Sequence, residues 1–332
     1  MGTLGYIARK VGAALLTLVF VMALNFFLFR IAGDPISQLT RSARLTPADQ
    51  EALREDLGIC QPPPGEARCS VIGHAATFPA YLRETLTGNF GVSVQSGDKV
   101  TTLIAERFWR TLLLLGLGTV FAIVIGILIG IRGAWKRGSF FDKSTLYGSM
   151  TLYSMPEGWL GMLLILLFGS LLAIFPSSGF QSPGNLSGFD QVADIANHLF
   201  LPVLVLTLGY IGEYAIVMRA SLLEMMGEDF VQTARAKGVP DRLVRRNHAV
   251  PNAILPTFTL VFLSFGFVVG GAIIVESVFS YPGLGQLTYQ AINTQDYPVL
   301  QAVFLISSAA VILFNLLADI LYGHLDPRIR SA

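Results

Sequence analysis

The sequence has 332 residues, of which 53% are hydrophobic and only 14% are charged, and its mean hydropathy is +0.60. Soluble domains of this length carry more charge, so the composition excludes an ordinary soluble protein and favours a membrane protein. The net charge of +1 gives no indication of nucleic-acid binding.

Six apolar stretches are predicted to cross the membrane, since each can bridge a hydrocarbon layer of about 30 Å at about 1.5 Å per helical residue. Five are uninterrupted: 11–29, 111–131, 199–218, 254–275 and 299–318. Within these five, Glu213 is the only charged residue. The sixth, 144–174, is broken at Met155-Pro156-Glu157-Gly158 and counts as one interrupted span, because the piece before the break is too short to cross alone.

The first stretch has two interpretations. Arg9 and Lys10 precede an apolar core, as in a signal peptide. That core is too long, however, and no small-residue cleavage site follows it, which favours a retained anchor helix.

Residues 31–105, between the first and second spans, are predicted to form an extracytoplasmic subdomain. Helices are expected near 47–57 and from Pro79 to Leu86, because each stretch has a proline in its first turn and a glycine after its end. Cys60 and Cys69 lie on the oxidising side, which favours a disulfide closing a small loop. Two unpaired thiols are the alternative.

Basic residues are distributed asymmetrically between the two sides of the predicted membrane. With the N terminus inside, the inner segments contain Arg9, Lys10, Arg132, Lys136, Arg137, Lys143, Arg219, Arg235, Lys237, Arg242, Arg245, Arg246, Arg328 and Arg330. The short outer loops, 175–198 and 276–298, contain no Lys or Arg. Short cytoplasmic loops are enriched in these residues, so both termini are predicted to be cytoplasmic.

The sequence contains no motif for nucleotide binding or for catalysis within the membrane. The nearest match to a phosphate-binding loop has Arg137 and Asp142 where both glycines are needed. None of the four histidines lies within a predicted span. The chain is therefore predicted to be no enzyme and to hold no cofactor or metal, so that energy for transport has to come from a partner or an ion gradient.

Three glutamates, Glu157, Glu213 and Glu276, lie in or at the ends of spans, where an ionised acid is costly and indicates a function. Glu213 lies deepest, between Tyr210 and Tyr214. Glu213, Tyr210 and Glu276 are candidates for a polar translocation path, and Glu213 is also a candidate for contact with a cationic substrate group. A structural hydrogen bond or a protonated acid is the alternative. Glu276 begins an outer loop, which favours a local cap or a contact beside a gate.

Two glycine pairs in the spans have the spacing of close helix contacts. They are Gly126 with Gly130, and Gly266 with Gly270. Such pairs allow helices to approach each other within the bundle or against a partner.

A polar segment, 229–256, lies between the fourth predicted span, 199–218, and the body of the fifth, 254–275. Residues Leu222 to Lys237 are predicted to continue the preceding span as a helix that Gly238 ends, and Pro240 suits the first turn of a second helix. An ordinary solvated basic loop is one interpretation. A contact with a partner protein is the other interpretation. It is favoured by the alanines between Thr233 and Gly238, whose small side chains leave a surface that fits into a partner's groove.

This segment resembles the EAA loop of binding-protein-dependent ABC importer permeases, in the form found in the dipeptide/oligopeptide/nickel group. Four further stretches match motifs of that family in the same order: Arg30–Pro35, Gly88–Ser93, Glu276–Gly285 and Asn315–Arg330. Ile254-Leu255-Pro256 closes the loop motif. Thr233 stands where the general motif has glutamate, and the spacing from glycine to proline is longer, as in the peptide subgroup.

The resemblance implies an all-α membrane protein with six transmembrane helices and the type I ABC importer permease fold. The expected domains are an anchor at 1–30, the extracytoplasmic subdomain at 31–105 and a five-helix core at 106–332 with a coupling loop at 223–253. By the same resemblance, contacts with a cytoplasmic ATPase come from Thr233, Ala234, Arg235, Ala236 and Gly238.

The implied function is that of a multi-pass cell-membrane permease subunit, forming half of a translocation pathway for peptides. The implied partners are a second homologous permease, ABC ATPases (separate or fused) that bind ATP and Mg, and an extracytoplasmic solute-binding protein. A proton-coupled secondary carrier that uses Glu213 or Glu276 is the alternative. A membrane scaffold without a pathway is the third class.

Overall fold

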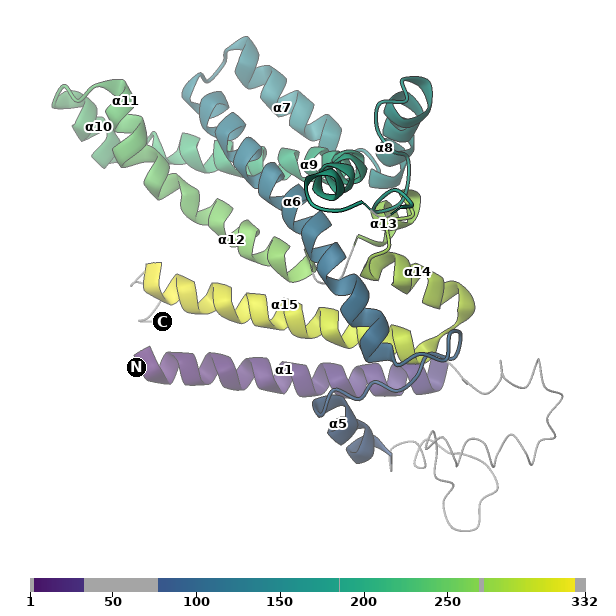
Figure 1. Cartoon of the computed structure of the whole chain (residues 1–332). Coiled ribbons are helices and arrows are strands. Elements are labelled where there is room, and N and C mark those ends of the chain that lie inside the picture. Colours follow the sequence, from purple (N-terminus) through teal and green to yellow (C-terminus); the bar gives the residue numbers. More distant parts are fainter. Residues whose placement is uncertain (1–2, 33–76, 185, 269–271, 326–332) are drawn as a thin grey trace, which may run out of the picture. The chain divides into compact units, whose positions relative to one another are not determined.

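The structure is a computed structural model that describes residues 3–32, 77–184, 186–268 and 272–325. In these ranges the regular structure is almost entirely helical (Figure 1), which confirms the all-α fold. The expected helix near 47–57 and the pair Cys60 and Cys69 lie outside the described residues.

Among the described residues, four helices are long and apolar enough to cross a membrane. They are α1 (Thr3–Ala32), α6 (Val100–Trp135), α9 (Phe189–Met225) and α15 (Tyr297–Leu325). These four correspond to the predicted stretches 11–29, 111–131, 199–218 and 299–318.

The interrupted stretch forms two helical arms. α7 (Phe140–Tyr153) is followed by α8 (Glu157–Leu164), which continues as the π-helix η1 (Ile165–Leu171), and the two arms meet at 98°. The bend lies at the predicted break, because Pro156 cannot donate the backbone hydrogen bond that would continue α7. Taken as one broken span, this pair is a fifth crossing.

The remaining predicted span, 254–275, is described only in part. α12 (Val250–Val268) covers its first portion, and α13 (Ile273–Val278) follows after residues 269–271, which lie outside the described ranges. The sixth crossing stays a prediction.

One compact unit joins the two ends of the chain, residues up to Phe108 and residues from Leu287. Within it, α1 and α15 run side by side in opposite directions (Figure 1). Lys10 Nζ lies 2.8 Å from Asp319 Oδ2, and Asn25 Nδ2 donates to the carbonyl oxygen of Gln301 at 3.1 Å. Polar contacts thus fix the register of two otherwise apolar helices.

The same unit contains α5 (Phe78–Leu86), which confirms the helix expected from Pro79 to Leu86. α5 packs on α1 through an aromatic cluster formed by Phe26, Phe27, Phe78 and Tyr81. Proline in the first turn and a left-handed Gly88, with φ +79°, delimit this helix as the sequence predicts.

Asp296, which is 3% exposed, ties the segment before α6 to the turn before α15. Its carboxylate accepts hydrogen bonds from Ser93 Oγ at 2.5 Å and from the backbone nitrogens of Val94 and Gln95 at 3.3 Å. Ser93 closes the second family-like stretch, so this anchoring gives that motif a structural reason.

The second compact unit comprises Trp109 to Gln286. Here α6 packs tightly on α9. A Cβ added at Gly126 would lie 2.7 Å from Tyr214 Cβ, and one added at Gly130 would lie 2.6 Å from the carbonyl oxygen of Ala215. Only glycine permits this approach, which confirms the role predicted for the first glycine pair. The second pair includes Gly270, outside the described residues.

The polar segment forms an elbow, defined here as residues Met226–Ala249, at one end of α12 (Figure 1). It contains α10 (Asp229–Ala236), α11 (Asp241–Leu243) and the π-helix η2 (Val244–Ala249), which runs directly into α12. The prediction of one continuous helix from Leu222 to Lys237 is wrong. α9 ends at Met225, and a turn through Gly227, a poor helix former, redirects the chain into α10.

Candidate functional site

α10 has an inner and an outer face. Val231 and Ala234, three residues apart, point inward and are 0% and 6% exposed. They pack in a core with Ala134, Met218, Leu222, Val244, Ala249 and Ala253. The elbow is therefore a packed structure rather than a solvated loop.

The outer face carries most of the residues assigned to the ATPase contact. Thr233, Arg235 and Ala236 are exposed on α10, and exposed Gly238 follows the helix. Ala234 differs, because its side chain is buried in the core of its own chain. We assign Ala234 to packing, whereas the other four remain predicted contacts.

Gly238 ends α10 in a left-handed conformation, with φ +76°. Its backbone nitrogen donates to the carbonyl oxygen of Arg235 at 2.9 Å, and the nitrogen of Val239 donates to that of Ala234 at 3.2 Å. These bonds satisfy carbonyls at the end of the helix, and the conformation they require favours glycine. No atom lies within 4 Å of an added Cβ at this position, so the requirement concerns the backbone and not space.

A partly buried ion pair supports the end of α9 that leads into the elbow. Arg219 donates to both carboxylate oxygens of Asp142, with Nε–Oδ1 at 2.5 Å and Nη2–Oδ2 at 2.9 Å. The backbone nitrogen of Gly138 donates to Oδ2 at 2.9 Å. A two-point pair of this kind fixes both distance and orientation, here between the start of α7 and the end of α9.

The acids of the predicted pathway lie in different surroundings. Glu157, in the first turn of α8, interacts with the hydroxyl of Tyr210 on α9, and Glu213 is close enough to Tyr210 for an electrostatic interaction. All three side chains are partly exposed in this chain. Tyr214 belongs to the core instead, because it is 1% exposed and donates to Ser264 Oγ at 2.6 Å.

Glu276 is 0% exposed and organises the loop that leads into α14 (Leu284–Thr294). Its carboxylate accepts from Thr111 Oγ1 at 2.9 Å and from the backbone nitrogen of Gln286 at 3.0 Å. A carboxylate is favoured there because the first amide groups of a helix lack partners within it.

The rest of this loop is built around the same carboxylate. Thr111 Oγ1 also accepts from the nitrogen of Leu284 at 2.7 Å, and the buried Tyr281 hydroxyl donates to the carbonyl oxygen of Arg110 at 2.8 Å. A Cβ at Gly283 would collide with Glu276 and Thr111. The geometry thus favours the local cap that the sequence indicated for Glu276, and it explains the glutamate, tyrosine and glycine of this stretch.

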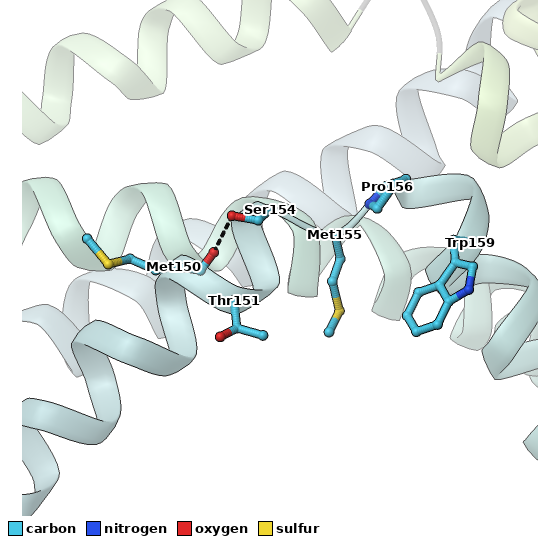
Figure 2. A pocket seen from close by; sticks show the side chains of 6 residues that line it. All are labelled: Met150, Thr151, Ser154, Met155, Pro156 and Trp159. Atoms are coloured by element: carbon cyan, nitrogen blue, oxygen red, sulfur yellow. Dashed lines mark hydrogen bonds between the residues drawn. The ribbon is translucent and has the colours of Figure 1, made fainter.

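A pocket of about 700 Å³ lies at the bend between α7 and α8. Figure 2 shows its lining residues: Met150, Thr151, Ser154, Met155, Pro156 and Trp159. The hydroxyl of Thr151 donates to the carbonyl oxygen of Tyr147, and that of Ser154 donates to the carbonyl oxygen of Met150. Because the helix backbone takes up both donors, the pocket presents mainly methionine and tryptophan surface.

Among the residues that the structure describes, no group of three potential metal ligands is brought together.

The sequence-based prediction missed two contacts, the ion pair Asp142–Arg219 and the hydrogen bond Thr111–Glu276. Each joins residues far apart in the chain. Charge placement near the ends of spans was the one available signal for the first pair.

Comparison with known proteins gives consistent results. Residues 122–331 match the family described as "Binding-protein-dependent transport system inner membrane component". The chain is 34% identical to the "Dipeptide transport system permease protein DppB" of Escherichia coli (strain K12), over 98% of this chain and 99% of that protein. It is 36% identical to the "Glutathione transport system permease protein GsiC" of Pectobacterium atrosepticum, with the same two coverages of 98% and 99%.

A solved structure shares the fold. The match is to an inward-facing conformation of the MetNI methionine ABC transporter, with a TM-score of 0.53 and 20% sequence identity. It covers 68% of this chain and 96% of that chain.

Proposed function

The chain belongs to the family of binding-protein-dependent transport system inner membrane components, and on this basis we propose that it is one permease subunit of an ATP-driven peptide importer. It is a multi-pass membrane protein. The peptide substrate is inferred from relatives whose names specify dipeptide and glutathione transport.

The elbow is the feature that supports coupling to an ATPase. Its inner face is fixed in a core that includes Ala134 of α6 and Met218 of α9, and its outer face presents Thr233, Arg235 and Ala236. A rigid short helix held in this way transmits displacement to the spans, whereas a mobile loop would absorb it. In the proposed complex, ATP and Mg are bound by the ATPases and not by this chain.

The proposed complex contains a second homologous permease, two ATPase domains on one or two chains, and an extracytoplasmic solute-binding protein. The elbow has to face the ATPases, so both termini of this chain lie in the cytoplasm. The distribution of Lys and Arg between short loops supports this orientation.

The proposed translocation surface includes Glu213 and Tyr210, with Glu157 beside them. These partly exposed groups can bind the ammonium group of a peptide as it passes. Glu276 contributes as the cap of the loop before α14, because its carboxylate is enclosed and bonded. The proton-coupled carrier gains no support from the relatives reported above, which are named as permease proteins of transport systems.

Thiol cross-linking in native vesicles tests the proposal. In a background with Cys60→Ser and Cys69→Ser, the variant Ala236→Cys should form a cross-linked product that contains a nucleotide hydrolase, because Ala236 is exposed on the outer face of α10. Ala80→Cys, on exposed α5, is the matched control and should give no such product.

The same vesicles should take up labelled peptide when ATP and the loaded binding protein are supplied. Failure of Ala236→Cys to capture a hydrolase, together with uptake driven by a pH step in the absence of ATP, would refute the proposal in favour of a gradient-driven carrier.

A further inference from the structure

Trp135, the last residue of α6, contacts three separate segments of the elbow. Its indole Nε1 donates to Asp241 Oδ2 of α11 at 2.7 Å. The guanidinium carbon of Arg235, on α10, lies 5.5 Å from the centre of the indole ring, and that of Arg245, on η2, lies 5.7 Å from it. These distances are typical of cation–π contacts.

The contacts join the two sides of Gly238. Arg235 precedes this glycine and Asp241 follows it, and Arg235 Nη2 lies 3.6 Å from Asp241 Oδ1. Gly238 has a left-handed backbone conformation, with φ +76°, which separates α10 from α11. One indole therefore bridges the break between α10 and α11.

α6 has no chain connection to the elbow, which α9 precedes and α12 follows. Displacement of α10 reaches α9 and α12 through the backbone, but it reaches α6 only through packing. Ala134 supplies an apolar contact from α6. Trp135 adds directional contacts, because its hydrogen bond to Asp241 and its cation–π contacts with Arg235 and Arg245 constrain rotation as well as distance.

We propose that Trp135 is a positioning residue for coupling, which fixes the rotation of α10 against the end of α6 so that movement of the elbow turns α6 together with α9 and α12. The proposal rests on the coupling function proposed above. It concerns orientation and not folding, since the side chains of Asp241 and Arg235 are 62% and 37% exposed, and exposed ion pairs are individually weak.

The test uses the complete reconstituted transporter and compares peptide transported per ATP hydrolysed. Trp135→Leu removes both kinds of contact and should lower this ratio at least about threefold, as expected for the loss of several weak directional contacts. Trp135→Phe keeps a ring for the two arginines and loses the N–H donor, so its ratio should be intermediate. Phe140→Leu, which removes an aromatic side chain that is 87% exposed at the start of α7, is the matched control and should leave the ratio unchanged.

A double substitution separates positioning from general damage. Asp241→Ala combined with Trp135→Phe should lower the ratio no further than the larger single effect, because each change alone already removes the hydrogen bond between Trp135 and Asp241. Yield of the assembled complex and the concentration of loaded binding protein at half-maximal uptake should match those of the unmodified protein in every variant.

An unchanged ratio in Trp135→Leu, within a complex that assembles normally, overturns the proposal while leaving the importer function intact. A fall in the ratio accompanied by an equal loss of assembled complex overturns it as well. If the unmodified chain assembles with no ATPase, the importer function itself is refuted, and the two failures are thereby distinguished.

Discussion

At the scale of single residues, backbone conformation and close packing explain why glycine is needed at positions 238 and 283. Gly238 is required for its φ of +76° and not for lack of space. Gly283 is required for space, because a side chain there would displace the carboxylate of Glu276. Glu276 is enclosed and bonded to Thr111 and to the backbone of Gln286, which supports its proposed role as the cap of a loop.

The first prediction at this scale concerns Gly238→Val. A β-branched residue in the left-handed region costs about 1–2 kcal/mol, equivalent to a 5- to 30-fold shift in a local equilibrium. The end of α10 should therefore lose its fixed conformation, and ATP-driven uptake should fall by a similar factor while membrane insertion is retained. Uptake by reconstituted vesicles and the amount of inserted protein are the two measurements.

Asparagine provides the control, since it tolerates the left-handed region better than other residues with side chains. Gly238→Asn should retain most of the uptake. Equal loss in both variants would show that a side chain at this position, and not the backbone, is what the site rejects.

At the scale of elements, contacts between helices decide which apolar stretches form a bundle. α6 and α9 approach closely at Gly126 and Gly130, and α7 meets α9 through Asp142 and Arg219. These contacts hold α6 and α7 against α9, the helix that precedes the elbow. The exposed face of α6, which includes Phe121 and Leu128, is left for lipid or a partner.

Substitution of Gly126 tests the contact between α6 and α9. In Gly126→Leu, the first added atom would lie 2.7 Å from Tyr214 Cβ and 2.9 Å from the carbonyl oxygen of Ile211, so the helices have to separate. We expect the free energy of unfolding to fall by about 1–3 kcal/mol, the usual cost of overpacking. The change is measured by unfolding the purified chain in mixed micelles that contain an increasing fraction of a denaturing detergent.

The control is Gly116→Leu in the same helix, where no atom lies within 4 Å of an added Cβ. This variant should unfold like the unmodified protein. Indistinguishable stabilities for the Gly116 and Gly126 variants would mean that the close approach of α6 and α9 contributes nothing in the membrane protein.

At the scale of the whole molecule, the orientation in the membrane determines what each site can do. The elbow can contact an ATPase only if it lies in the cytoplasm. The hydrogen bond between Ser93 and Asp296 can stabilise an outer loop only if that loop faces the exterior. The asymmetry of Lys and Arg predicts both placements together.

Labelling by a membrane-impermeant thiol reagent measures this orientation. In the cysteine-free background, Ser187→Cys, exposed in the loop before α9, should react in intact cells. Ser139→Cys, at the start of α7, should react only after the membrane is made permeable. The reverse pattern would place the elbow outside and would contradict the coupling function.

The sequence by itself determined the all-α class, the positions of the long apolar helices, the break at Pro156 and the end of α10 at Gly238. These features depend on hydrophobic length and on local backbone preferences, which neighbouring residues in the chain determine. The family also followed from sequence, because its motifs occur in a fixed order.

Tertiary structure decided which side of each element is used. It placed Ala234 inward, enclosed Glu276 beside Thr111 and brought Trp135 to Asp241. The physical reason is that each of these outcomes depends on a contact between residues distant in the chain. Periodicity and composition describe a helix alone, and they carry no information about which neighbour will cover it.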